Sequence, residues 1–291
     1  MSTTAGRRQL VMVCVDGSED GLRALRYAVQ EATRLHAVLR VVHVQQQIVL
    51  LAPTMPLVPD PTLHEVAAEI LKHAEQEARR LGYDGPELEA VLADGPRNAA
   101  LLENSTDASC LVLGRRSARL QHLVGGSTTS SLAAHAKVPV ISVPETWQPG
   151  PPRGVVAVGV DESEYSAAAL RAAWAAARAR GARLEIVHAW RPLFEYDVAI
   201  GARVLAQEWT EATRTSLTAW VHDNAPDGDV EWTVQPHYDS ATVALHEASE
   251  TADLLVLGRH GHGRRHGLGL GSTVRTMLRA GGCPVMVVPS S

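Results

Sequence analysis

The sequence predicts an α/β fold made of two copies of one domain, each with helices on both faces of a mostly parallel sheet. Short apolar segments alternate along the chain with segments of helical period. Strands that alternate with helices favour a parallel sheet. Landmarks also recur at one spacing: Asp16 and Asp161, like His43 and His188, are 145 residues apart. A repeat of this length indicates a duplicated domain rather than a solenoid.

The two copies are separated by a segment that cannot continue a helix or a strand. Residues 147–153 contain three prolines and one glycine. We therefore expect a first domain over residues 1–146, a linker over 147–153 and a second domain over 154–291. The length of 291 residues suits two domains of ordinary size.

The elements of each copy are expected in the same order. In the second copy, Ser163 is a candidate N-cap for the first helix, a long amphipathic helix includes Trp209, and a short helix begins near Val243. The strands of the second copy are expected at residues 155–160, 184–189, 230–234, 254–257 and 285–288. Those of the first copy are expected at residues 10–15, 39–44, 87–92, 111–113 and 138–143.

Composition excludes several classes of function. A net charge of -5 provides no overall basic field, so we expect no nucleic acid partner. No apolar run approaches the roughly 18–20 residues of a membrane span, and the polar start does not resemble a signal peptide. Cys14, Cys110 and Cys283 have no metal-ligand spacing and are interpreted as small buried hydrophobic residues. These features predict a cytoplasmic protein that is not bound to a membrane.

A glycine-rich segment follows the fourth expected strand of the second copy. Residues 258–271 include six glycines and three arginines, and Ser272 and Thr273 come next. Glycines let the backbone approach a ligand closely, and successive N–H groups at a helix start bind anions. The segment therefore predicts a phosphate site, with a flexible surface loop as the alternative. It lacks the Gly-Lys-Ser/Thr ending of a P-loop, and the dinucleotide fingerprint would follow the first strand instead.

Asp161 follows the first expected strand of the second copy and has two interpretations. Its carboxylate could accept hydrogen bonds from a nucleobase or a ribose, or it could merely cap the next helix. Carboxyl ends of parallel strands form ligand sites where the strand order reverses, and Asp161 and Gly258 both follow such ends. His43 and His188, which end apolar strands, are interpreted as partly buried structural histidines rather than catalysts.

The histidines of the glycine segment raise the question of a metal. His260, His262 and His266 have a His-x-His-x3-His spacing, but no cysteine or carboxylate lies close by in the sequence. A solvated or phosphate-facing role is the alternative, and the one that we favour. A magnesium ion would then arrive with the nucleotide, because Mg²⁺ uses phosphates and few protein ligands.

At these residues the chain resembles the universal stress protein family, in its tandem two-domain and ATP-binding form. The family pattern Gly-x2-Gly-x9-Gly-Ser/Thr fits Gly258, Gly261, Gly271 and Ser272 without a gap. Val-Gly-Val-Asp at 158–161 and Cys-Pro-Val-Met-Val-Val at 283–288 are also similar to that family. The resemblance covers nearly the whole chain.

The resemblance implies two Rossmann-like domains of the adenine nucleotide alpha hydrolase-like type, each with a five-stranded parallel sheet that holds ATP. Asp161 would meet the adenine, Gly159 would leave space for it, and Val187 would lie beside it. The implied nucleotide-binding residues of the second domain are Gly159, Val160, Asp161, Val187, Gly258, Arg259, His260, Gly261, His262, Gly263, Arg264, Gly271, Ser272 and Thr273. A homodimer, or pairing of the two halves within one chain, is also implied.

The first copy departs from this pattern. Cys14 replaces Gly159, Ser117 replaces Gly261, and the segment from Ser117 to the next Gly-Ser is one residue shorter. A Cβ at such a position costs about 1 kcal/mol or more where the dihedral is unfavourable. We therefore predict weaker or absent nucleotide binding in the first domain. The candidate residues that remain there are Asp16, Val42, Gly114, Gly126, Ser127 and Thr128.

Three functions remain open from the sequence. The first is an ATP-binding stress or regulatory protein with little or slow hydrolysis, whose protein partner the sequence does not identify. The second is an enzyme that uses the same site for ATP hydrolysis or for adenylyl or phosphoryl transfer. The third is a structural dimer with a vestigial site. The absence of an evident Ser-His-Asp set, carboxylate pair or cysteine nucleophile favours the first.

Overall fold

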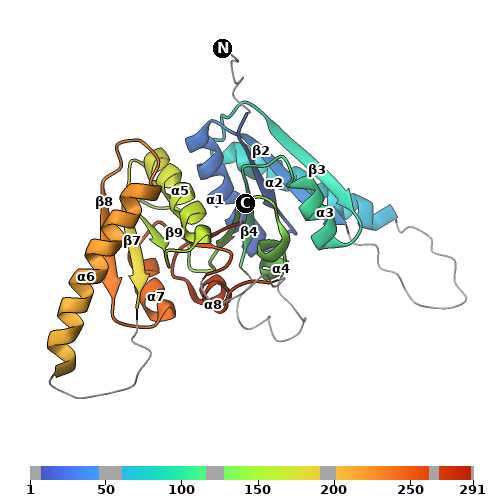
Figure 1. The fold of residues 1–291 in the computed structure, drawn as a ribbon. Helices are drawn as coiled ribbons and strands as arrows, with labels where there is room; N and C mark the ends of the chain where they lie inside the picture. Colours follow the sequence, from blue (N-terminus) through green and yellow to red (C-terminus); the bar gives the residue numbers. More distant parts are fainter. Residues whose placement is uncertain (1–7, 46–60, 116–127, 191–200, 262–268, 290–291) are drawn as a thin grey trace, which may run out of the picture. The chain divides into compact units, whose positions relative to one another are not determined.

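The computed structural model describes residues 8–45, 61–115, 128–190, 201–261 and 269–289 of the chain (Figure 1). The chain divides into two compact units, Met1–Pro149 and Gly150–Ser291. Each unit is an α/β domain with a parallel sheet between helices, so the predicted fold class is confirmed. Within the described residues, no helix is long and apolar enough to cross a membrane.

The first unit contains five parallel strands in the order β3-β2-β1-β4-β5. Helices α1 and α2 cover one face of the sheet, and α3 and α4 cover the other. The strands are β1 (Leu10–Cys14), β2 (Val38–Gln45), β3 (Leu88–Asp94), β4 (Cys110–Gly114) and β5 (Val140–Val143). The helices are α1 (Glu19–Leu35), α2 (Pro61–Arg80), α3 (Arg97–Asn104) and α4 (Thr128–His135).

The second unit repeats this arrangement, with the strand order β10-β9-β6-β7-β8. Helices α5 and α6 pack on one face, and α7 and α8 on the other. The strands are β6 (Val155–Gly159), β7 (Arg183–Ala189), β8 (Trp232–His237), β9 (Leu254–Gly258) and β10 (Val285–Val288). The helices are α5 (Glu164–Arg180), α6 (Gly201–Asn224), α7 (Ala241–Thr251) and α8 (Ser272–Ala280).

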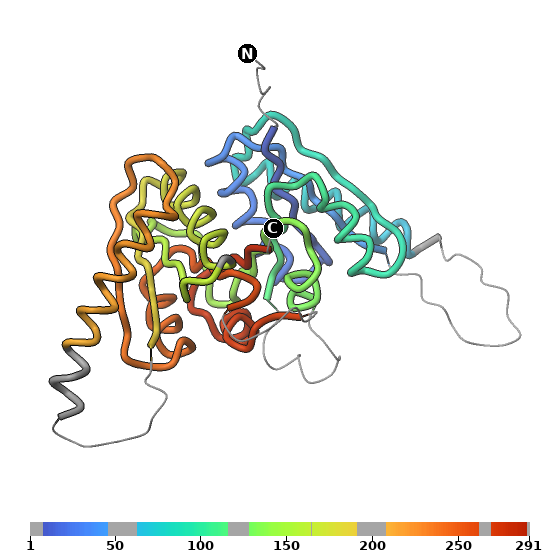
Figure 2. Tube along the Cα trace, viewed as in Figure 1, coloured from blue at the N-terminus to red at the C-terminus, as the bar shows by residue number. Residues whose placement is uncertain are grey.

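The order of the strands fixes where a ligand can bind in the second unit. From β6 the chain runs through β7 to β8, and it then returns to the other side of β6 with β9 and β10 (Figure 2). The strand order therefore reverses between β6 and β9, which pair directly. Ligands of open parallel sheets bind outside the carboxyl ends of the strands at such a point.

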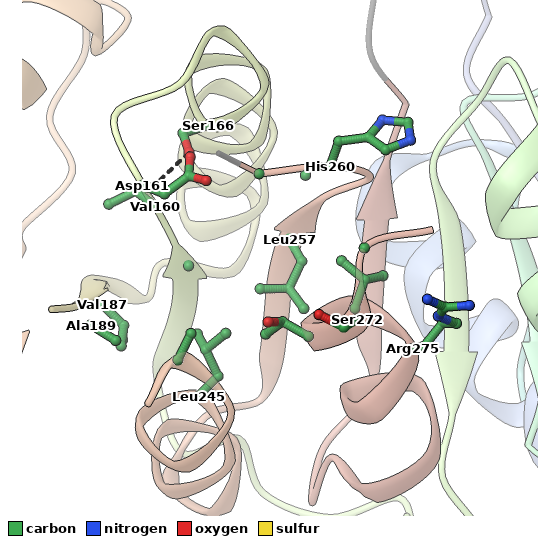
Figure 3. Close-up of a pocket in the computed structure, with 17 residues that line it drawn as sticks. Val160, Asp161, Ser166, Val187, Ala189, Leu245, Leu257, His260, Ser272 and Arg275 are labelled. Carbon is green, nitrogen blue, oxygen red and sulfur yellow. Dashed lines mark hydrogen bonds between the residues drawn. The ribbon is translucent and has the colours of Figure 1, made fainter. Parts of the chain in front are cut away.

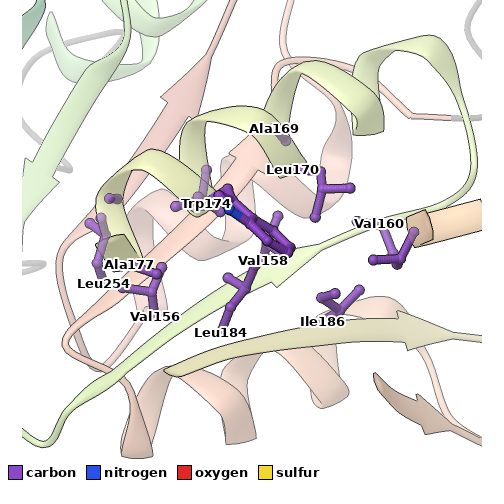
Figure 4. Packing of buried hydrophobic residues seen from close by; sticks show 14 of the residues in the cluster. Val156, Val158, Val160, Ala169, Leu170, Trp174, Ala177, Leu184, Ile186 and Leu254 are labelled. Carbon is purple, nitrogen blue, oxygen red and sulfur yellow. The ribbon is translucent and has the colours of Figure 1, made fainter. Parts of the chain in front are cut away.

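The core of the second unit lies between the sheet and helix α5 (Figure 4). Trp174 of α5 is 5% exposed and packs among the buried side chains of β6 and its neighbours. These strands are apolar along most of their length, because a parallel sheet is covered on both faces. This packing holds β6 and the start of α5 in a fixed relation, and both contribute to the site described below.

The eighth strand departs from the expectation. Residues 230–234 were expected, whereas β8 spans Trp232–His237 and includes Pro236. Pro236 has no N–H to donate to a neighbouring strand, and it is tolerated because β8 ends the strand order of its unit. The apolar pattern alone placed the strand two to three residues too early.

The three cysteines differ in burial. Cys110 and Cys283 are buried as expected, and burial raises the pKa of the Cys283 thiol to about 12. Cys14 at the end of β1 is only partly buried, so the expectation of a buried residue is wrong for this cysteine. It stands at the carboxyl end of the sheet, where packing from the helices is less complete.

The residue after each strand-end aspartate adopts a left-handed backbone conformation. Glu162 follows Asp161 with φ 62°, and Gly17 follows Asp16 with φ 77°. Glycine adopts this region without a steric penalty, whereas a residue with a Cβ does not. The second unit therefore accepts at Glu162 a strain that the first unit avoids.

Replacing Glu162 by glycine should raise the free energy of unfolding of the second unit by roughly 0.5–1 kcal/mol. The gain arises from relief of the left-handed strain at this exposed position. Urea unfolding measures the effect, and Glu162→Ala is the matched control, since it removes the carboxylate but keeps the Cβ. An equal gain from alanine would show that backbone strain is not the cause.

Candidate functional site

A cavity of about 520 Å³ opens at the carboxyl ends of β6 and β9 in the second unit (Figure 3). Its volume falls within the usual range for small-molecule sites. The structure brings ten of the predicted residues into its lining: Gly159, Val160, Asp161, Val187, Gly258, His260, Gly261, Gly271, Ser272 and Thr273. Residues that lie up to about a hundred positions apart in the sequence therefore meet at the predicted switch point.

One end of the cavity carries the Asp161 carboxylate. Its Oδ1 accepts hydrogen bonds from the backbone N–H of Ser163 at 3.2 Å, the Ser163 hydroxyl at 2.6 Å and the Ser166 hydroxyl at 2.5 Å. Ser163 in turn caps α5 by accepting from the Ser166 N–H. The alternative that Asp161 itself caps the helix is therefore wrong, because Ser163 is the N-cap. Asp161 supports that cap, and its carboxylate still lines the cavity.

His188 holds the backbone that leads into Asp161. Its Nδ1 donates to the carbonyl of Val160 at 3.0 Å, and His43 makes the equivalent bond to Val15 at 2.8 Å. Both rings are partly buried, and neither lines the cavity. The expected partial burial of both histidines is confirmed, and each ring supports the backbone before a strand-end aspartate.

Two glycines allow close approach of the glycine segment to the start of α5. A Cβ at Gly261 would overlap Oδ2 of Asp161. A Cβ at Gly258 would lie 3.0 Å from the carbonyl oxygen of Tyr165, which is tighter than an ordinary contact. The glycines of the motif thus have a packing role even without a ligand, because a side chain at either position would push the two loops apart.

The other end of the cavity is formed by the start of helix α8. Its N-cap, Gly271, makes no side-chain hydrogen bond, whereas Ser18, Ser163 and Ser240 cap α1, α5 and α7. The first N–H groups of a helix have no partner within the helix and favour anions. Ser272 and Thr273 add hydroxyl groups beside them. This end is therefore suited to a phosphate group.

The wall between the two ends is apolar. Val187, Ala189, Leu245 and Leu257 line it, from strands β7 and β9 and helix α7 (Figure 3). A Cβ at Gly159 would lie 2.7 Å from a methyl group of Leu257. Glycine at this position therefore leaves Leu257 and Leu245 of the wall the space that a Cβ would take.

His260 and Arg259 serve the glycine segment in different ways. His260 Nε2 donates to the carbonyl of Gly269 at 2.5 Å, so this side chain joins the two described ends of the segment. Its ring also contacts Tyr165 edge-on at 5.5 Å. Arg259 is half-buried, and burial lowers the pKa of its guanidinium. The lining of the cavity does not include Arg259, so the structure does not bring this predicted residue into the site.

Some predicted residues cannot be placed. His262, Gly263, Arg264, Gly126 and Ser127 lie outside the described residues. Seven lining residues were missed: Ser166, Ala189, Ala241, Leu245, Leu257, Val274 and Arg275. Ser166 had a local signal, the Ser-x-x-Ser pattern that begins α5. Leu257, Val274 and Arg275 are neighbours of predicted residues, whereas Ala241 and Leu245 of α7 reach the cavity only because α7 packs on the sheet.

The first unit places its candidate residues differently. Asp16 Oδ1 accepts from the Ser18 N–H at 3.2 Å and from the Ser18 hydroxyl. Val42 is fully buried in β2 beside Cys14, and Thr128 begins α4. A Cβ at Gly114 would overlap the carbonyl of Asp20, so helix α1 approaches β4 very closely.

No group of three or more potential metal ligands occurs among the histidine, cysteine, aspartate and glutamate residues that the structure describes. Of the three histidines considered, only His260 lies in that part of the chain, and it bonds to a carbonyl. A magnesium ion would therefore depend on phosphate oxygens, and the lining offers the Ser272 and Thr273 hydroxyls at that end.

The fold and the cavity define an α/β protein with a duplicated parallel-sheet domain and a cavity at the switch point of the second copy. The sequence profile of the universal stress protein family matches residues 8–144 and 153–289. The chain therefore belongs to the universal stress protein family, in tandem form.

Three known proteins illustrate what the chain is similar to. A universal stress protein of Mycobacterium tuberculosis is 30% identical over 300 residues, covering 95% of this chain and 94% of the relative. The crystal structure of a universal stress protein from Archaeoglobus fulgidus has the same fold, with a TM-score of 0.70, 20% identity and coverage of 97% and 98% of the two chains. A universal stress protein crystallised in complex with cAMP is 24% identical, covers 47% of this chain and 98% of its own, and has a TM-score of 0.39.

Proposed function

We propose that the second unit binds an adenine nucleotide, ATP in the first place, and that the chain is a nucleotide-dependent stress or regulatory protein. The observation that carries this proposal is the cavity that joins the Asp161 carboxylate to the start of α8, whose N-cap has no side chain. The adenine would lie against the apolar wall, with its amino group donating to Asp161. The phosphates would accept from the α8 N–H groups and from Ser272 and Thr273.

The character of the lining favours binding over rapid chemistry. The described lining contains one acidic residue, Asp161, and one histidine, His260, as candidate general bases. Asp161 Oδ1 accepts from Ser163 and Ser166, and His260 Nε2 donates to Gly269. A general base must reach the nucleophile that it activates. The proposed nucleotide places Asp161 at the adenine, at the other end of the cavity from the phosphates, and His260 Nε2 already donates to a carbonyl. We therefore expect little or slow hydrolysis of ATP, by attack of water.

The remaining expectations belong to the same proposal. Magnesium would accompany the nucleotide and would supply charge neutralisation at the phosphates. A cytoplasmic location and association as a homodimer, or as an intrachain pseudo-dimer, remain predictions. Bound nucleotide would contact the glycine segment and so change a surface that a partner protein recognises.

Freshly purified protein should release an adenine nucleotide on denaturation, detected by mass spectrometry. Protein freed of ligand should bind ATP in a calorimetric titration with one site per chain, since the first unit carries Cys14 and Ser117 in place of glycines. Two equal sites would contradict the predicted difference between the units. Failure to bind ATP, ADP or AMP would refute the proposed function, and fast sustained phosphate release would favour an enzyme.

A further inference from the structure

Ser166 lies directly behind the Asp161 carboxylate and was not expected in the site. It belongs to the first turn of α5, is 4% exposed and lines the cavity. Its hydroxyl donates to Asp161 Oδ1 at 2.5 Å and accepts from the Asp161 backbone N–H at 2.8 Å. One hydroxyl has both a donor and acceptor positions, so both bonds are satisfied together. Ser166 therefore fixes the backbone and the side chain of Asp161 at once.

The bonds to Oδ1 determine the direction of Oδ2. Ser163 and Ser166 both bond to Oδ1, on the side of helix α5. Oδ2 lies on the side of Gly261, a glycine of the cavity lining. Rotation of the carboxylate would break hydrogen bonds to a charged acceptor, which are stronger than those between neutral groups. Asp161 is thus held in one orientation before any ligand arrives.

The first unit provides an internal comparison. Ser18 makes to Asp16 the bonds that Ser163 makes to Asp161. Gly21, however, stands where the second unit has Ser166, and glycine has no hydroxyl to offer. The serine behind the carboxylate is therefore not required for this fold of strand, turn and helix, and its presence in the second unit calls for another explanation.

We infer that Ser166 is a positioning residue that makes the second site selective for adenine. This inference rests on the proposed function and adds the determinant of base choice. The 6-amino group of adenine donates to a carboxylate, whereas hypoxanthine carries an acceptor oxygen there and a donor at N1. A carboxylate held in one orientation cannot move from the amino position to the N1 position. Without Ser166, only the two bonds from Ser163 hold Oδ1, so the carboxylate turns more readily toward either donor and its preference for adenine falls.

The experiment compares the binding of ATP and ITP by calorimetry in the full chain. Wild-type protein should prefer ATP, and Ser166→Ala should weaken ATP binding about tenfold while the ratio of ATP to ITP affinity falls several-fold. Ser249→Ala is the matched control, because Ser249 is also a buried serine of the second unit (0% exposed) with two hydrogen bonds, and it does not line the cavity. The ratio of ATP to ITP affinity in Ser249→Ala should equal that of the wild type.

The outcomes separate the inference from the function. A Ser166→Ala variant that binds with an unchanged ATP to ITP ratio overturns the positioning role, even if its affinity falls. Should that variant not fold, Ser166→Cys keeps the volume but removes the strong donor, and an unchanged ratio there overturns the inference equally. A wild-type protein that binds neither nucleotide refutes the proposed function, and the positioning role with it.

Discussion

Replacing Gly261 by alanine should weaken ATP binding to the second unit by at least about tenfold, or about 1.4 kcal/mol. The new Cβ would overlap Oδ2 of Asp161. The end of a flexible side chain would normally move aside at little cost. Here, however, Ser163 and Ser166 bind the other carboxylate oxygen, so the displacement breaks hydrogen bonds or moves the glycine segment. Calorimetric titration with ATP measures the loss.

Two further glycines serve as controls for this result. A Cβ at Gly150 would meet open space, and the φ of this residue is not positive, so Gly150→Ala should bind ATP like the wild type. At Gly271 a Cβ would make only an ordinary contact, at 3.7 Å from the Arg259 carbonyl. Gly271→Ala should therefore fold normally, and any loss of affinity would come from the approach of the phosphates. Unchanged affinity of Gly261→Ala would contradict the proposed role of this glycine.

Replacing Trp174 by alanine should destabilise the second unit by about 3–5 kcal/mol. The indole is 5% exposed and packs among the strands and helices of the core, so its removal leaves a large cavity (Figure 4). Domains are typically stable by only about 5–15 kcal/mol, and the loss is a large part of that. Hydrogen exchange of peptides from β6–β10 measures the stability of the second unit alone. The measurement does not require the two units to unfold together in one step.

Trp209→Ala tests whether burial causes the loss of stability. Trp209 is also a tryptophan, but it lies on α6 and is 45% exposed. It should cost much less than Trp174→Ala. Trp174→Phe should also be milder, because it removes less volume together with an indole N–H that has no partner among the described residues. Equal effects of the two alanine substitutions would contradict the account of the core.

Much of the fold followed from local patterns in the sequence. Apolar strands such as Val155–Gly159, and the serine caps of the following helices, depend on neighbouring residues alone. The repeat allowed each element to be predicted twice, because equivalent residues such as Asp16 and Asp161 are expected at equivalent positions of the two domains. The predicted bounds of the edge strand β8 were too early, because its position depends on pairing with β7 rather than on its own apolar pattern.

The candidate site was predictable only in part. Asp161 and the glycines were found because glycine and a strand-end carboxylate have few other uses in such a pattern. Leu245, Ala241 and Ala189 were missed, since alanine and leucine are ordinary core residues until the packing of α7 against β6 and β7 turns them toward the cavity. Arg259 was predicted as a ligand, yet its side chain does not line the cavity.

The sequence by itself determined the duplicated α/β architecture, the family and the location of the better-preserved motif in the second copy. The architecture follows from the period of the apolar residues and from landmarks that recur after 145 residues, and the family follows from the resemblance of the motifs. Only the tertiary structure decided how the Asp161 carboxylate is oriented, because that depends on Ser166, on the closeness of Gly261 and on the left-handed turn at Glu162. Hydrogen bonds depend on distances of about 3 Å and on angles that a pattern of residue types does not specify, and the closeness of Gly261 depends on the packing of two segments about a hundred residues apart.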